Sequence, residues 1–269
     1  MLGALTGDIV GSIYEWNNIK STEFPLFQDG CRFTDDSVLT AALADAIMTG
    51  APYEDSMRHY YRSYPDAGYG RGFVAWAKSD APKPYNSWGN GAAMRVSPVG
   101  WACDTLADVL CMARNHTLPT HGHPEGVKGA QAVAGAVFLA RTGASKEELR
   151  SFVTREFGYD LTRCCDEIRP SYRFDVSCQG TVPQAVTAFL ESEDFEGAIR
   201  LAVSLGGDSD TLACITGAIA QAFYGGVPAH IAERTMDFLD DRLKRVTVAF
   251  EARFVAGRFA AAKGGALKQ

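Results

Sequence analysis

Leu205-Gly206-Gly207-Asp208-Ser209-Asp210-Thr211-Leu212-Ala213 joins two glycines to a pair of carboxylates and a hydroxyl, directly before an apolar run. The run, residues 212–223, is rich in small and apolar side chains, which predicts a buried helix. Asp208 and Ser209 occupy positions typical of N-cap residues, so the carboxylates are predicted at the start of this helix. Oxygen donors without a nearby His or Cys suit a hard cation such as Mg²⁺, Ca²⁺ or Mn²⁺ rather than zinc.

A second acidic helix start lies far upstream, at Phe33-Thr34-Asp35-Asp36-Ser37. It repeats the same chemistry, a threonine beside two carboxylates, before an apolar run over residues 38–47. An Asp before a helix is most often only a cap, and that interpretation stays open for either stretch taken alone. Together the two stretches could supply the oxygens that a pair of hard cations needs, provided that they meet in space.

The bulk composition is that of an ordinary globular chain. It has 269 residues, 46% of them hydrophobic and 22% charged, enough for one large domain or two small ones. A net charge of −6 argues against a surface that coats nucleic acid. No apolar run is long enough to span a bilayer, and the N-terminus lacks the basic region of a secretory signal, so no membrane association is expected.

Cysteine usage indicates the compartment. Seven cysteines are present, an odd number, and no C-x-x-C pair occurs. This pattern predicts reduced thiols packed as small hydrophobic side chains in a cytoplasmic protein.

Helical periodicity and helix-ending residues occur along the whole chain, whereas alternating strand patterns do not. Gly3, Gly7 and Gly11 recur on one face of the first predicted helix and indicate close contact with another helix. With no linker or repeat to divide it, the chain is predicted to form one all-α domain over residues 1–269, with a flexible tail at 259–269. The predicted helices are residues 2–16, 36–49, 53–64, 102–115, 125–141, 145–157, 184–190, 194–204, 212–223, 229–239 and 240–258.

Residues 78–100 form the longest stretch without clear periodicity, and they are rich in glycine. A loop of this kind inside a compact domain is usually functional. Trp88 could belong to the core, although an aromatic side chain flanked by Gly and Ser on a loop favours a stacking surface.

Six motifs in a fixed order cover residues 3 to about 225, and together they resemble the ADP-ribosylglycohydrolase family, which includes the dinitrogenase-reductase-activating glycohydrolases. The resemblance implies orthogonally packed helices with two Mg²⁺ ions, or Mn²⁺, at the base of a cleft. It also implies hydrolysis of a glycosidic bond at ribose C1″, with release of ADP-ribose. The motifs are Gly7-Asp8-x-x-Gly11-Ser12-x-x-Glu15, Thr34-Asp35-Asp36, Gly89-Asn90-Gly91-Ala92-Ala93-Met94-Arg95, Thr120-His121, Val182-Pro183-Gln184-Ala185 and Gly206-Gly207-Asp208-Ser209-Asp210-Thr211.

The same resemblance implies roles for individual residues. One cation would be bound by Thr34, Asp35 and Asp36, and the other by Asp208, Asp210 and Thr211, with Asp210 bridging. Glu15 would lie near the second cation, and either Glu15 or an aspartate ligand such as Asp35 or Asp36 would deprotonate the attacking water. The residues implied to hold the diphosphate and ribose are Ser87, Trp88, Gly89, Asn90, Gly91 and His121.

Physical chemistry supports this assignment and leaves alternatives open. A glycine-rich loop exposes backbone N–H groups to which an anionic diphosphate can bind. Asp8, in the middle of the first predicted helix, is expected to make structural hydrogen bonds. Arg95 is expected to form a buried ion pair rather than to bind phosphate. His121 and His123 could instead be loop histidines that fix the backbone.

The linkage stays open among arginine, serine, O-acetyl-ADP-ribose, nucleic acid and small molecules. Asp66, Asp80 and Asp104 are candidates for an acid near a leaving guanidinium. The expected partner is an ADP-ribosylated protein or small molecule, and the chain is expected to be a monomer. The alternative function is a non-catalytic member that binds ADP-ribose or serves structurally, as the lens crystallins of the family do.

Overall fold

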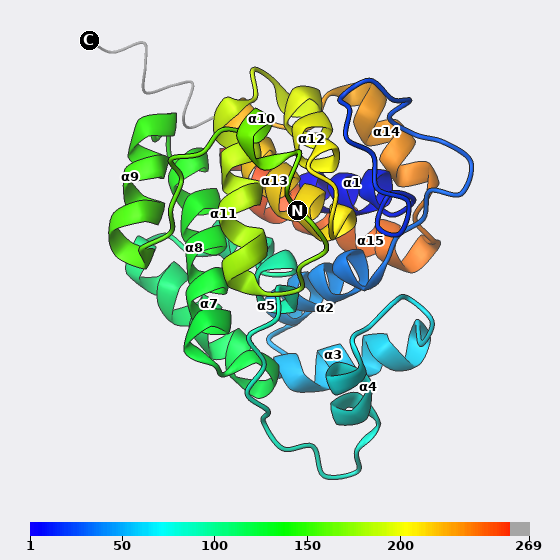
Figure 1. Ribbon diagram of the computed structural model, residues 1–269. Helices are drawn as coiled ribbons and strands as arrows, with labels where there is room; N and C mark the ends of the chain where they lie inside the picture. Colours follow the sequence, from blue (N-terminus) through cyan, green and yellow to red (C-terminus); the bar gives the residue numbers. More distant parts are fainter. Residues whose placement is uncertain (259–269) are drawn as a thin grey trace.

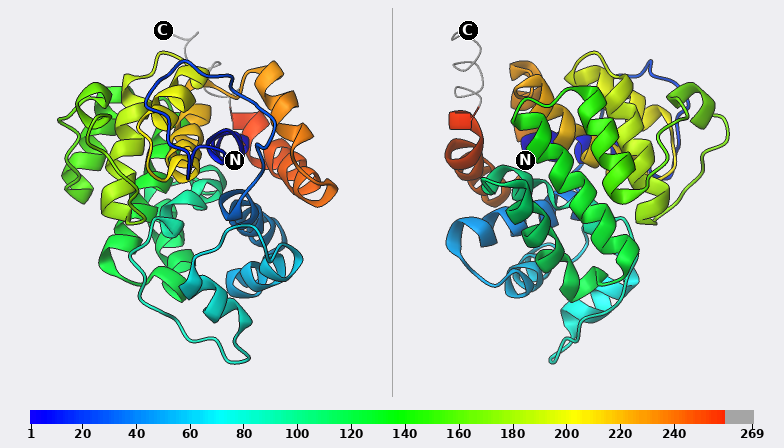
Figure 2. Two further views of the ribbon diagram at one scale, coloured as in Figure 1. Left: turned by 45° about the vertical axis from the view of Figure 1, so that its right-hand side comes forward. Right: turned by 90° about the vertical axis from the view of Figure 1, so that its left-hand side faces the viewer.

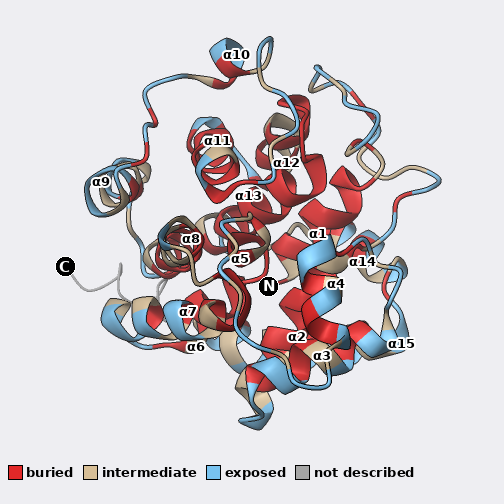
Figure 3. Ribbon diagram, turned by 60° about the horizontal axis from the view of Figure 1, so that its bottom comes forward, coloured by how far each residue is buried: buried red, intermediate tan, exposed pale blue. Residues whose placement is uncertain are grey.

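Helix α13 (Ser209–Tyr224) runs through the centre of the computed structural model, which describes residues 1–258 (Figure 1). Its residues are buried from Ser209 to Ala222, and Figure 3 shows the buried colour concentrated on this helix and its neighbours. The apolar run after the acidic stretch is therefore a core helix, as predicted. The helices packed against it include α1 (Leu2–Gly11), α8 (Pro124–Arg141), α11 (Cys178–Glu191) and α12 (Phe195–Ser204).

The glycine face of α1 sets how closely that helix approaches α13. A Cβ atom on Gly7 would lie 1.9 Å from the carbonyl oxygen of Ala213, and one on Gly3 would lie 2.3 Å from that of Gly217. Both distances are far inside van der Waals contact, so only glycine permits this backbone-to-backbone packing. The predicted helix contact is confirmed, and it carries Asp8 of α1 to the start of α13.

We expect Gly7→Ala to destabilise the protein by on the order of 3 kcal/mol, because backbone atoms of α13 would have to move to admit the methyl group. Urea denaturation followed by circular dichroism measures the change. Gly257→Ala is the matched control, since a Cβ atom there meets nothing within 4 Å, and it should change stability by less than about 0.5 kcal/mol. Equal effects of the two substitutions would contradict the packing argument.

The remaining helices surround this core. In Figures 1 and 2 the cyan segment, which contains α3, α4 and the loop that follows them, projects from the lower edge of the molecule below α2. One continuous hydrophobic core joins the helices, so the chain is a single all-α domain. These helices are α2 (Asp35–Thr49), α3 (Tyr53–Ser63), α4 (Arg71–Lys78), α5 (Gly91–Met94), α6 (Ser97–Ala102), α7 (Leu106–His121), α9 (Lys146–Phe157), α10 (Cys165–Ile168), α14 (Ala229–Asp237), α15 (Asp241–Phe250) and the π-helical turn η1 (Glu251–Val255).

Several helices begin or end where their caps predict. Helix α9 has the predicted capping box, with Ser145 and Glu148 satisfying each other's backbone N–H groups. Helices α2 and α9 end at Gly50 and Gly158, each in the left-handed conformation that glycine adopts readily.

Other boundaries differ from the prediction. The first helix ends at Gly11 rather than residue 16, because Ser12 Oγ donates to the Ile9 carbonyl at 2.8 Å and competes with further helix. Helix α11 begins at Cys178 rather than Gln184, since Ser177 Oγ accepts from Gly180 N at 3.0 Å and caps the chain there.

The predicted loop over residues 78–100 is shorter than expected, because α5 and α6 occupy its second half. Helix α7 extends to His121 with Pro119 in its last turns, so His121 ends a helix and is not a loop residue. Within residues 1–258 the structure contains only isolated β-bridges and no strands, in agreement with the all-α prediction.

None of the helices in the described part of the chain combines the length and apolar character of a bilayer span. The tail at 259–269, predicted to be flexible, lies outside the described residues.

Candidate functional site

The two acidic helix starts meet in space, which is the condition that the sequence left open. Helices α2 and α13 begin side by side, and Thr211 Oγ1 donates to Asp36 Oδ2 across 3.3 Å. The two residues are 175 positions apart in the chain, so only the tertiary fold brings them together.

Asp8 of α1 adds a further carboxylate beside the two helix starts, and it also fixes the start of α2. Its carboxylate accepts from Thr34 N at 2.9 Å, from Thr34 Oγ1 at 2.6 Å and from Ser37 N at 3.1 Å. The Ser37 hydroxyl donates to it as well. These are the structural hydrogen bonds expected of a buried mid-helix Asp, and they turn the α2 acids toward α13.

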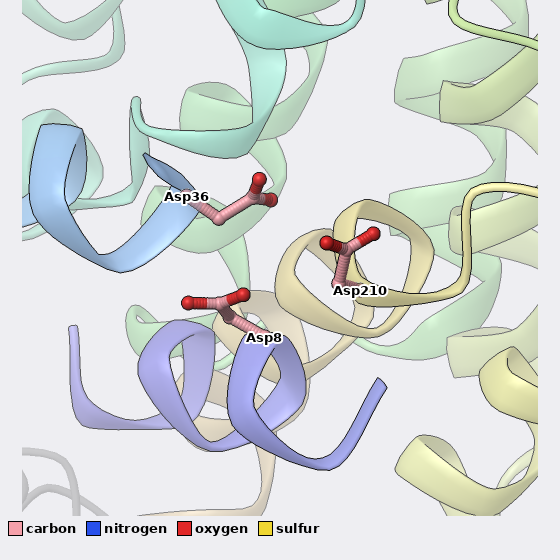
Figure 4. Close-up of side chains that lie close together, drawn as sticks. All are labelled: Asp8, Asp36 and Asp210. Atoms are coloured by element: carbon pink, nitrogen blue, oxygen red, sulfur yellow. The ribbon is translucent and has the colours of Figure 1, made fainter. Parts of the chain in front are cut away.

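Two groups of carboxylates could each hold a cation. Oxygen atoms of Asp8, Asp36 and Asp210 lie within 4.8 Å of one another, and Figure 4 shows the three side chains directed toward a common point from three helices. A second group, with the same spacing, consists of Glu15, Asp208 and Asp210. Asp210 belongs to both groups, as the predicted role of a bridging ligand requires.

The donor set fits hard divalent cations. Asp36 Oδ1 is buried without a hydrogen-bond partner, and an orphaned carboxylate oxygen calls for a proton or a cation. Among residues 1–258, no Lys or Arg forms an ion pair with the acids of either group. Carboxylate oxygens without nitrogen or sulfur donors are the ligands that Mg²⁺ and Mn²⁺ prefer.

Burial raises the pKa of every carboxylate in the cluster. It raises the pKa of Glu15 to about 7, with the negative charge of Asp210 as the next cause, and the pKa of Asp208 to about 6. The pKa values of Asp35 and Asp36 lie well above their usual range for the same two reasons. The cluster is thus a concentration of negative charge that a cation would stabilise.

These shifts predict how stability depends on pH. The folded state binds protons on Glu15 and Asp208 more tightly than the unfolded chain does, and this difference adds to the free energy of unfolding. The added stability is fully present below about pH 4 and is lost as the pH rises through 6 to 7. In EDTA the melting temperature should therefore fall by on the order of 5 °C between about pH 5 and pH 8.

Saturating Mg²⁺ should reverse this slope, because cations compete with protons for the same oxygens. Differential scanning calorimetry with EDTA and with MgCl₂ gives both curves. Asp208→Asn should reduce the slope in EDTA. A melting temperature that rises with pH in EDTA would contradict the assignment.

Five of the acids, Glu15, Asp35, Asp36, Asp208 and Asp210, line a cleft of about 450 Å³, whereas Asp8 is fully buried and does not line it. Five of the six residues expected to hold substrate line it, together with Arg32 and Tyr85. Trp88 does not line it: its side chain is 46% exposed, and its carbonyl accepts from Cys178 N at 3.0 Å. The lining residues include Glu15, Trp16, Arg32, Thr34, Asp35, Asp36, Asp66, Tyr85, Ser87, Gly89, Asn90, Gly91, Arg95, His121, Phe174, Val176, Asp208, Asp210 and Thr211.

The aromatic residues that line the cleft are Trp16, Phe73, Tyr85 and Phe174, and Trp16 and Phe174 form a stacked pair there. Their rings stack with centroids 5.1 Å apart, and Trp16 is 73% exposed. Sequence reasoning missed both residues. The available signal was the position of Trp16 directly after Glu15, whereas nothing near Phe174 marked it.

Asn90 supports the acidic cluster from the glycine-rich loop. Its amide donates to Asp208 Oδ2 at 2.6 Å and to Thr181 Oγ1 at 3.1 Å. Asp208 is the N-cap residue of α13 by position, but its side chain makes no capping hydrogen bond. The predicted position of Asp208 at the start of α13 is confirmed, whereas the alternative that it serves only as a cap is not supported, because its carboxylate accepts from Asn90 instead of from the helix backbone.

Two further expectations are corrected. Arg95 is buried, but among the described residues it pairs with no carboxylate, and its Nη2 donates to Thr120 Oγ1 at 2.6 Å. Of the three acids proposed for a leaving guanidinium, only Asp66 lines the cleft. Asp104 instead pairs with Arg258 at 2.9 Å.

An all-helical fold with a carboxylate-lined cleft defines the chain as a helical protein with a candidate cation site. The sequence matches the model of the family described as ADP-ribosylglycohydrolase over residues 1–262, and the chain belongs to that family. It is 28% identical to ADP-ribosylhydrolase ARH3 of Homo sapiens, with 84% of each chain covered. It is 26% identical to ADP-ribosylarginine hydrolase Tri1 of Pseudomonas putida (strain GB-1), with 87% of this chain and 72% of that protein covered.

A solved structure confirms the fold. The ADP-ribosylglycohydrolase-related protein complex superposes with a TM-score of 0.68 at 26% identity, and the match covers 93% of this chain and 96% of that one. The family and the fold together make this protein an enzyme of the hydrolase class, an ADP-ribosylglycohydrolase.

Proposed function

We propose that the protein is a divalent-cation-dependent hydrolase that cleaves the glycosidic bond at ribose C1″ of ADP-ribosylated protein, through arginine or serine, or of an ADP-ribosylated small molecule. The product is free ADP-ribose. The observation that carries the proposal is the pair of carboxylate groups that share Asp210, whose members all line one cleft except the fully buried Asp8. Relatives named ADP-ribosylhydrolase and ADP-ribosylarginine hydrolase support the substrate class.

The proposed cofactor is two Mg²⁺ ions, with Mn²⁺ as the substitute. Asp8 lies close enough to join the first set as a further ligand. When bound, the cations would lower the pKa of a water molecule and orient the ribose hydroxyls. The first cation is assigned to Thr34, Asp35 and Asp36, and the second to Asp208, Asp210 and Thr211.

Glu15 is the proposed general base. A carboxylate is most effective as a base near its own pKa, and burial raises the pKa of Glu15 to about 7. Its negative charge also stabilises the oxocarbenium-like charge that develops at C1″ during cleavage. Asp35 and Asp36 are the alternative bases.

The substrate anion is assigned to the segment Ser87 to Gly91 and to His121. The Gly89 N–H donates to Ser87 Oγ at 3.1 Å and the Asn90 N–H to Val176 O at 2.7 Å, so both are already occupied. Within residues 1–258 the Gly91 N–H makes no hydrogen bond, and since Gly91 lines the cleft, this N–H is a backbone donor left for a phosphate oxygen.

Asp66 favours a cationic leaving group. It is exposed and lines the same cleft as Glu15, so its carboxylate could bind the guanidinium leaving group of an arginine-linked substrate. The seven cysteines are all free thiols, which supports the proposed cytoplasmic location.

The function is tested by measuring the release of ADP-ribose by chromatography, with MgCl₂ and with EDTA. The substrates are arginine-linked peptides, serine-linked peptides and O-acetyl-ADP-ribose. We expect release that depends on the cation and is fastest for one linkage. Unchanged release in EDTA would overturn the cation dependence. Binding of ADP-ribose without turnover of any linkage would indicate a non-catalytic member.

A further inference from the structure

Arg95 is a buried cation without a counter-ion beside the cleft. Its side chain is 2% exposed, and in the described part of the chain no carboxylate pairs with it. Its hydrogen bonds are to α7, where Nη2 lies 2.6 Å from Thr120 Oγ1 and 3.2 Å from His121 Nδ1, and its guanidinium carbon lies 5.9 Å from the centroid of the Tyr53 ring. A buried unpaired charge is costly, so a purely structural link between these elements would favour a neutral side chain.

The chemistry of this contact determines where His121 carries its proton. A guanidinium has only donors, so a ring nitrogen that faces Arg95 must accept. Thr120 Oγ1 accepts from Arg95, and its own hydroxyl proton is free to point at Nδ1 across 2.9 Å. With Nδ1 accepting, the proton of a neutral imidazole is on Nε2.

The opposite edge of the ring faces the glycine-rich loop. Nε2 lies 3.1 Å from the position that a Cβ atom would take on Gly91, and 3.5 Å from that on Gly89. Both glycines therefore keep space open beside Nε2, which makes no hydrogen bond to any residue in 1–258. His121 lines the cleft, so this N–H is a donor available to a ligand.

We propose that Arg95 is a positioning residue that holds His121 in the Nε2–H tautomer, so that the ring presents one fixed donor to an anionic or hydroxyl oxygen of the substrate. The identity of that substrate rests on the proposed function. The tautomer does not, because it is a property of the protein without ligand. Burial, and next the positive charge of Arg95, lower the pKa of His121 well below its usual value, which keeps the ring neutral at pH 7.

The ring nitrogens of uniformly ¹⁵N-labelled protein report the tautomer by long-range ¹H–¹⁵N correlation, with His121→Asn identifying the resonances. We expect wild-type His121 to be neutral with the proton on Nε2 between about pH 6 and pH 8. In Arg95→Met, Nδ1–H becomes compatible with Thr120 and should appear, whereas Arg95→Lys keeps an obligatory donor and should retain Nε2–H. Nδ1–H in the wild type, or an unchanged tautomer in Arg95→Met, would overturn the proposal.

Arg141→Met is the matched control for loss of a buried guanidinium. Arg141 donates to the carbonyl oxygens of Gly100 and Cys103 and does not line the cleft. Its substitution should lower stability without changing the His121 tautomer. If Arg95→Met fails to fold, the wild-type and Arg95→Lys spectra still decide the question.

Binding of ADP-ribose by calorimetry tests the functional consequence. Arg95→Met and His121→Asn should each raise the dissociation constant by about tenfold, which corresponds to the loss of one hydrogen bond to a charged group. The double variant should be no weaker than His121→Asn alone, because Arg95 acts through His121. Additive losses would show an independent role for Arg95 and overturn the proposal. If wild-type protein does not bind ADP-ribose at all, the proposed function fails while the tautomer result stands.

Discussion

Asp210→Asn is expected to lower kcat/KM by at least about a thousandfold. The reason is that Asp210 belongs to both carboxylate groups, so one amide weakens two cation positions together. Cation binding measured by calorimetry should be lost at one position and weakened at the other. Kinetics of ADP-ribose release in saturating MgCl₂ measure the effect on activity.

The same substitution should not unfold the protein. Burial and the charge of Asp208 raise the pKa of Asp210 well above its usual range, so removing this carboxylate relieves repulsion in the cation-free state. In EDTA the melting temperature of the variant should equal or exceed that of the wild type. Asp80→Asn, an exposed acid outside the cleft, is the control and should leave activity within about twofold. Activity within tenfold of wild type in Asp210→Asn would refute the shared-ligand assignment.

Glu15→Gln is expected to lower kcat by about a hundredfold to ten-thousandfold, the usual contribution of a general base. Glutamine keeps the shape of the side chain and cannot take a proton, so the affinity for ADP-ribose should change by less than about threefold. A fall in kcat without a matching loss of product affinity separates a catalytic role from a binding role.

The pH profile gives an independent check on Glu15. The base acts when it is deprotonated, so wild-type kcat should fall as pH drops through the pKa of Glu15, which is about 7 without cations and lower when they are bound. Glu15→Gln should lose this acidic limb. Glu23→Gln, on the same loop but exposed, should keep both the rate and the profile. If Glu15→Gln retains more than about a tenth of wild-type kcat, Asp35→Asn becomes the next variant, because an aspartate would then be the base.

Much of the candidate site was predictable from local sequence. Thr34-Asp35-Asp36 and Asp208-Ser209-Asp210-Thr211 both precede apolar helical runs, and side chains in the first turn of a helix are tilted toward its N-terminal end. That regularity places each acid at a definite point, and the structure adds only that the two points coincide. The close helix contact at Gly3, Gly7 and Gly11 was predictable for the same reason, since their spacing places them on one helix face.

Other features had no local signature. Trp88 was predicted on a functional loop and Trp16 at the end of the first helix, yet only Trp16 lines the cleft and stacks on Phe174. The direction of a loop side chain depends on contacts with distant segments, such as that between the Trp88 carbonyl and Cys178 N. Arg95 was expected to find a carboxylate, but the fold placed Thr120 and His121 against it instead.

The sequence by itself determined the all-helical class, the burial of the helix after Asp210 and the oxygen-rich chemistry of two helix starts, because these follow from periodicity and side-chain type over short distances. Only the tertiary structure decided that Asp8, Asp36 and Asp210 converge, that Asn90 holds Asp208 and that Trp16 lines the cleft. The physical reason is that these relations join segments far apart in the chain. Their distances are set by how whole helices pack, down to the absence of a side chain at Gly7.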